Sequence, residues 1–145
     1  FYDTLCILGS VYTIQQEIAV RTLLEKLSVK YGSNKSVENG LSAIIPMLIE
    51  CGLLVRSSIS IYRLGTPFVV TDASIINLLI YIDIISSNLS SVVKEDIPFR
   101  PFLKFFPFEL NQATFGVLIS LEESRSGGGY VIPRKSEKRS NKKTK

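Results

Sequence analysis

Residues 35–65 decide the fold of this chain, and they read KSVENGLSAIIPMLIECGLLVRSSISIYRLG. Apolar residues recur at helical spacing as far as Glu50, and Cys51-Gly52 then predicts a stop, because glycine adopts the backbone conformation that ends many helices. Residues 53–56 and 58–64 alternate as strands do, and they predict an antiparallel hairpin joined at Ser57 and Ser58. The stretch therefore predicts a helix, a tight turn and a small hairpin, in that order.

The helix in this stretch has one apolar face and one irregularity. Ser36 is placed to cap it, with Glu38 in the first turn, where the helix dipole favours an acid. Pro46 cannot donate a hydrogen bond to the carbonyl of Ser42 and costs about 3 kcal/mol inside a helix, so we expect a kink near Ile45. The residues predicted to face the core are Val37, Leu41, Ile44, Ile45 and Leu48.

A second amphipathic helix is expected before this stretch, over residues 14–31. Its apolar residues recur at helical spacing, Thr13 and Gln16 fit a capping box, and Gly32 supplies a C-terminal stop. Residues 32–35 have the composition of a turn. Residues 1–11 form either a helix or a buried strand, since the apolar run is too short for its period to decide. The chain starts at Phe1, as if inside an element, so we expect a fragment or a processed chain.

The chain after Gly65 predicts a further helix and an aromatic loop. Residues 68–70 can add a strand, and Thr71 or Asp72 then caps a helix over residues 73–93. This helix is apolar nearly all round, as is typical of helices buried in a core or paired with another subunit. Residues 97–110 contain three prolines and five phenylalanines, which predict an irregular loop clamped onto the core.

The last part of the chain leaves helix and strand open for residues 111–125. Asn111 can cap a helix that ends at Gly127-Gly128-Gly129, but the β-formers within residues 114–121 favour a strand instead. Residues 130–133 look extended. Residues 134–145 predict a polar tail that becomes ordered only when it is bound.

The positive charge of the chain is concentrated in this tail. Residues 134–145 carry seven bases and one acid, a net charge of +6, whereas the whole chain carries +4 and residues 1–133 therefore −2. Residues 13–70 are weakly basic, with six bases against four acids. A tail of this composition suits phosphate contacts that carry no sequence information.

Composition argues against several classes of site. The chain has no histidine and two cysteines, so a zinc site of the usual kind is not expected, and neither is a histidine-based catalytic pair. Cys6 and Cys51 are flanked by aliphatic residues and predict buried thiols rather than a disulfide framework. No apolar run approaches the roughly 20 residues of a membrane span. We expect a non-catalytic, soluble cytoplasmic protein without a cofactor or a metal.

The residues GSNKS, the helix that follows them and the hairpin VRSSISIYRLG resemble the winged-helix family. The resemblance covers about residues 13–70. It implies duplex DNA binding, as in transcription regulation, with the helix in the major groove and the hairpin as a wing. The DNA-binding residues it implies, together with those of the basic tail, are Asn34, Lys35, Ser36, Asn39, Ser42, Arg56, Arg63, Arg134, Lys135, Lys138 and Arg139.

We therefore expect a mainly α protein with a small β-hairpin, of the α+β class. Residues 1–70 are predicted to be a winged-helix-like domain, residues 71–126 a helical and aromatic extension packed on it, and residues 127–145 a glycine-rich turn and basic tail. The alternative function is that of an interaction or scaffold subunit, which would use the winged-helix fold and the apolar helix within residues 73–93 to bind a partner protein or its own copy. Fold alone does not choose between them.

Overall fold

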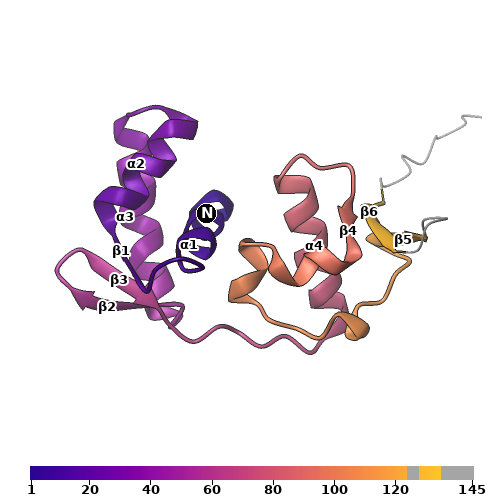
Figure 1. Ribbon diagram of the computed structural model, residues 1–145. Coiled ribbons are helices and arrows are strands. Elements are labelled where there is room, and N and C mark those ends of the chain that lie inside the picture. Colours follow the sequence, from indigo (N-terminus) through magenta and orange to yellow (C-terminus); the bar gives the residue numbers. More distant parts are fainter. Residues whose placement is uncertain (124–127, 135–145) are drawn as a thin grey trace, which may run out of the picture.

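The structure, a computed structural model, describes residues 1–123 and 128–134. It combines helix and sheet, which confirms the α+β expectation in general terms. Figure 1 shows the elements of residues 1–64 on the left and those from residue 73 onward on the right, joined by an extended segment. The described residues contain two three-stranded antiparallel sheets. The chain therefore has more strands than the single small hairpin that was predicted.

The first group of elements builds one sheet and three helices. In chain order these are α1 (Tyr2–Val11), β1 (Glu17–Ala19), α2 (Val20–Tyr31), α3 (Lys35–Glu50), β2 (Leu54–Ser58) and β3 (Ile61–Leu64). The sheet has the order β1-β3-β2. Tyr62 in the central strand pairs with Ile18 on one side and with Arg56 on the other. Ile18 and Tyr62 are buried together with apolar residues of the helices, so this face of the sheet forms part of the core.

The N-terminal boundaries differ from the sequence prediction. Residues 2–11 form a helix, which settles the open choice for that segment, but α2 begins at Val20 rather than at residue 14. Thr13 does not cap a helix, because its hydroxyl donates to the Gly9 carbonyl at 2.9 Å. Ile18 is buried through its pairing with Tyr62, a contact 44 residues away in sequence that local periodicity does not reveal.

Helix α3 forms as predicted over most of its length, with a different cap. Leu41, Ile45 and Leu48 are buried and Val37 and Ile44 are half-buried, which confirms the apolar face. Asn34, not Ser36, is the N-cap. The helix continues through Pro46 to Glu50. Ser42 and Pro46 are both exposed, so water can reach the carbonyl that proline leaves without a donor.

The hairpin is present, but its turn lies two residues later than predicted. A register shift between Arg56 and Ser58 makes a bulge at Ser57, and Ile59 and Ser60 form the turn, with Ser60 at a φ of 60°. The bulge matters because an extra residue in one strand changes which side chains share a face.

The second group of elements packs around helix α4 (Ala73–Ser86). It continues with β4 (Val92–Val93), η1 (Lys94–Phe99), η2 (Phe102–Phe105), η3 (Leu110–Gln112), β5 (Ile119–Glu123) and β6 (Gly129–Pro133), and its sheet has the order β4-β6-β5. Of the two predicted caps, Thr71 and Asp72, it is Asp72 that caps α4, with its carboxylate accepting from the Ser74 and Ile75 amides. The helix ends at Ser86 rather than at residue 93, because Asn88 adopts a φ of 55° and turns the chain.

For the segments without clear periodicity, some of the predictions are confirmed and others are wrong. Residues 68–70 form no strand, although the amides of Phe68 and Val70 donate to carbonyls of residues 105 and 107. The aromatic segment is clamped onto the core as predicted, with Phe102 and Phe105 buried, while Phe99 remains 77% exposed. The described part of residues 111–125 contains a 3-10 turn and strand β5, so the long helix from Asn111 is wrong and the strand alternative is closer.

A buried carboxylate on α4, Asp83, joins the two groups of elements. Asp83, 2% exposed, accepts hydrogen bonds from the Arg100 guanidinium and from the Tyr2 hydroxyl, the latter at 2.7 Å. Arg100 also donates to the Ser87 hydroxyl at 2.9 Å. Burial and the bond to Asp83 raise the pKa of Tyr2, so its hydroxyl remains protonated and donates. Helix α1 is thereby fixed against α4.

Helix α1 also approaches the aromatic segment so closely that only glycine fits at residue 9. A Cβ at Gly9 would lie 2.1 Å from the carbonyl oxygen of Pro101. Nearby, the rings of Tyr2 and Phe102 pack with centroids 5.0 Å apart.

Two Gly→Ala substitutions in helices should have opposite effects on stability. Gly9→Ala should destabilise the chain by about 2 kcal/mol or more, because the clash is with backbone. Gly40→Ala in α3 meets nothing within 4 Å. It should therefore stabilise by about 0.5–1 kcal/mol through helix propensity. Urea unfolding measures both, and equal effects would contradict the close packing of α1 on Pro101.

Removing Arg100 should be among the more damaging single changes. Arg100→Ala leaves Asp83 buried without its cationic partner, which costs about 3–5 kcal/mol. Lys26→Ala removes a cation from an exposed position and should change stability by less than about 0.5 kcal/mol. Thermal unfolding of both variants compares them, and a small effect at Arg100 would contradict the role of the ion pair.

Candidate functional site

The polar residues predicted on α3 lie on its solvent-exposed face. Lys35, Ser36, Asn39 and Ser42 are all exposed, and none of the described later segments covers them. Lys35, Ser36 and Asn39 lie on the side of the helix away from the buried Leu41, and Ser42 lies at the edge of this face and lines a hollow with Ile45. This half of α3 is therefore accessible to solvent along its polar face.

Asn34 lies beside this face but is engaged within the chain. Its side-chain oxygen accepts from the Val37 amide at 3.1 Å, and its side-chain nitrogen donates to the Tyr31 carbonyl at 3.2 Å. Both ends of the amide are used in closing the turn between α2 and α3. Asn34 thus acts as a cap and turn residue, with one N–H and one lone pair of its side-chain amide engaged within the chain.

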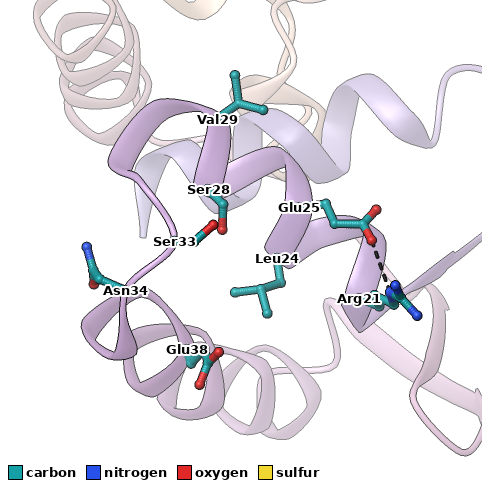
Figure 2. A pocket seen from close by; sticks show the side chains of 8 residues that line it. All are labelled: Arg21, Leu24, Glu25, Ser28, Val29, Ser33, Asn34 and Glu38. Carbon is teal, nitrogen blue, oxygen red and sulfur yellow. Dashed lines mark hydrogen bonds and ion pairs between the residues drawn. The ribbon is translucent and has the colours of Figure 1, made fainter.

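A shallow groove runs between α2 and the start of α3. Figure 2 shows its lining, with Leu24 of α2 and Glu38 of α3 extending into the space between the helices and the Arg21–Glu25 ion pair at one end. This part has a volume of about 440 Å³. Leu24 and Glu38 also line a second hollow of about 330 Å³, which Ser42, Arg56 and Tyr62 border. The two hollows therefore lie next to each other, with Leu24 and Glu38 bordering both, and we refer to them together as the groove.

Arg56 reaches this groove from the hairpin. It pairs with Tyr62 across β2 and β3, so both side chains are on the same face of the sheet. The guanidinium donates to the Tyr62 hydroxyl at 3.3 Å and lies 5.7 Å from the centre of its ring. The Tyr62 ring is buried and holds this cation at the groove. The role of Tyr62 cannot be predicted from the sequence, because it depends on the register of β2 and β3.

Arg63 does not join this site. It pairs with Val55 and Glu17, and successive residues of a strand point to opposite faces, so Arg63 lies on the face of the sheet away from Tyr62 and Arg56. It borders a separate hollow formed by residues 12–16. The two arginines predicted as one wing surface are therefore separated by the sheet.

The charges around the groove and on α3 nearly cancel. Exposed cations are Arg21, Lys35 and Arg56, and exposed acids are Glu25, Glu38 and Glu50. Arg21 and Glu25 form an ion pair at 3.0 Å on consecutive turns of α2. Any polyanion bound here would gain little from net charge and would depend on hydrogen bonds or on cations from elsewhere in the chain.

The predicted tail lies almost wholly outside the described residues. Lys135, Lys138 and Arg139 are among the residues that the structure does not describe. Arg134 is described and exposed, and its amide donates to the Leu118 carbonyl at 2.8 Å at the end of β6. The basic segment therefore starts from the second sheet.

Other kinds of site find little support among residues 1–123 and 128–134. No cluster of three or more His, Cys, Asp or Glu gathers there as a metal site would require. No helix in the described part is long and apolar enough to cross a membrane. Both cysteines are free; Cys6 is half-buried, and burial raises the pKa of its thiol. Cys51 is exposed, contrary to the expectation of a buried thiol, because it follows the last turn of α3.

Comparisons with protein families, with curated proteins and with solved structures found no match to this chain.

The capping role of Asn34 predicts a substitution pattern unlike that of a base-contacting residue. Asn34→Ala should destabilise the free protein by about 1 kcal/mol, because the Val37 amide loses its acceptor. Asn34→Asp should retain most of that stability, since a carboxylate also accepts and suits a helix N-terminus. Urea unfolding without any ligand checks this, and a fully stable Asn34→Ala variant would contradict the capping role.

Proposed function

We propose that this chain is a non-catalytic winged-helix protein that binds duplex DNA. Helix α3 would enter the major groove with its first half, and the β2–β3 hairpin would act as the wing. We propose transcription regulation as its role and the cytoplasm as its location. The observation that supports the proposal is the exposed polar half of α3, together with the hollow beside it that Ser42 and Arg56 both line.

The arrangement of the first 64 residues supports this proposal. The order of elements α1, β1, α2, α3, β2, β3 and the sheet order β1-β3-β2 agree with the pattern of helices and wing to which the resemblance points. A short turn joins α2 to α3, as in helix-turn-helix proteins, where the second helix lies in the major groove.

The exposed side chains suit distinct parts of a duplex. Asn39 carries a side-chain amide, the group that pairs with both adenine N6 and N7 in the major groove. Ser36 and Ser42 can donate to or accept from base edges or phosphates. Lys35 and Arg56 flank these residues and suit phosphate oxygens. Asn34 and Arg63 are no longer part of the proposed contact surface.

The basic tail would supply most of the salt-dependent affinity. The surface of α3 and its groove is close to neutral, whereas residues 134–145 carry a net charge of +6. Each phosphate neutralised adds about 0.9 to the slope of log affinity against log salt. In this proposal α3 orients the protein on the duplex, and the tail supplies most of the positive charge that attracts the phosphates.

A second candidate function is that of an interaction subunit. It is favoured by the large apolar side chains exposed on α4, among them Ile75 and Leu78, which DNA binding does not require. This function would leave the α3 surface without a nucleic-acid ligand, so a DNA titration distinguishes the two.

Matched arginine variants test the proposed DNA contact. Arg56→Ala should weaken binding to a mixed-sequence duplex at low salt and lower the salt slope by about 1. Arg63→Ala removes the same charge from the other face of the sheet and should change neither quantity. Fluorescence anisotropy over a salt series measures both, and equal effects of the two substitutions would overturn the proposed orientation of the hairpin.

A truncation after Arg134 completes this test. It should weaken binding and flatten the salt slope, while the difference between Arg56→Ala and Arg63→Ala persists at the lowest salt. The absence of any binding at low salt by the full chain would leave only the interaction subunit.

A further inference from the structure

Helix α4 presents an apolar stripe to solvent. Ile75, Leu78 and Ile85 are 51%, 45% and 48% exposed, and Ile82 lies half-buried between them. The opposite side of the helix is buried, with Ile76, Ile80 and Ile84 in the core. We call the four residues Ile75, Leu78, Ile82 and Ile85 the α4 stripe. Figure 1 shows α4 within the right-hand group of elements.

The spacing of the stripe is that of a helix-pairing seam. Its residues follow one another at intervals of three, four and three positions, which keeps them along one side of a helix and matches the spacing of coiled-coil contacts. The face therefore suits another helix better than it suits a flat sheet or a polar ligand.

The stripe is also symmetric about the middle of its helix. Residue numbers 75 and 85, and likewise 78 and 82, lie equally far from position 80, and α4 runs over Ala73–Ser86. When two copies of this helix pair in opposite directions, Ile75 of one faces Ile85 of the other and Leu78 faces Ile82. Each layer then joins two aliphatic side chains, and every contact occurs twice, as a two-fold interface requires.

The charges on α4 are compatible with such self-pairing. Asp83 is the one charged residue of the helix, and it is buried against Arg100. Ser74 and Ser86 flank the stripe and are neutral. Two copies therefore meet without like-charge repulsion, and the stripe offers no charge pattern that would select a different partner.

The residues of the given sequence that lie outside the described structure are too polar to suit the stripe. The residues outside the described structure are SRSG at 124–127 and KSEKRSNKKTK at 135–145, and neither segment contains an aliphatic or aromatic residue. An apolar face of this kind is best covered by equally apolar side chains.

From these observations we infer that the α4 stripe is a homodimer interface, in which two copies of this chain pair their α4 helices antiparallel. The contact is small compared with the roughly 1,200–2,000 Å² of a standard stable interface, so the dimer should form reversibly and depend on protein concentration. The inference is independent of DNA binding, because nothing in the contact involves α3.

Sedimentation velocity of the full chain over a wide concentration range, without DNA, is the test. Ile75→Glu and Ile85→Lys should each weaken dimerisation at least about tenfold, because each places a charge opposite an aliphatic side chain. A mixture of the two variants should restore dimers, since the new carboxylate at position 75 of one copy then faces the new ammonium at position 85 of the other. The other contact between positions 75 and 85 in this mixed dimer still joins two isoleucines. Val117→Glu, at an apolar residue 85% exposed outside the stripe, should leave dimerisation unchanged.

Several results would overturn the inference. These are a monomer at every concentration, a dimer insensitive to both single variants, or a stripe occupied by a different cellular protein while the chain remains monomeric. Dimers that both variants abolish but that mixing does not restore would exclude the antiparallel pairing, because parallel helices place residue 75 against residue 75.

Discussion

The pairing of Arg56 with Tyr62 across the hairpin is the constraint on which the candidate site depends. Tyr62 is buried, its carbonyl accepts from the Tyr12 hydroxyl at 3.1 Å, and its own hydroxyl accepts from Arg56. The same residue thus joins α1, the sheet and the groove. If the register slipped by one position, Arg56 would change faces and the groove would lose its cation. The candidate site is therefore a consequence of how the core packs around Tyr62.

A second buried polar cluster organises the other half of the described chain. Asp83 would be costly to bury alone, but Arg100 and Tyr2 satisfy it from different elements, and together they fix α1 and the aromatic segment against α4. This cluster lies on the inner side of α4, whereas the exposed residues of the helix are aliphatic residues and serines. The proposed dimer surface and the proposed DNA surface therefore lie on different helices.

Local patterns in the sequence predicted the elements that are stabilised locally. The apolar face of α3, the Asp72 cap and the hairpin all follow from spacing and capping chemistry within a few residues. Strand β1 and the start of α2 were missed, because Ile18 becomes a strand residue only through distant pairing with Tyr62. The exposure of Asn39 and Ser42 could be foreseen from helical periodicity. The separation of Arg56 from Arg63 could not, because it depends on the bulge at Ser57 and on the register.

The most direct test of the DNA-binding account is a residue-by-residue map of amide NMR shifts as duplex DNA is added at low salt. The account predicts that the changes concentrate on residues 35–42 of α3 and on the hairpin around Arg56, with further changes in residues 134–145. Changes restricted to the basic tail, or an unchanged spectrum, would contradict it.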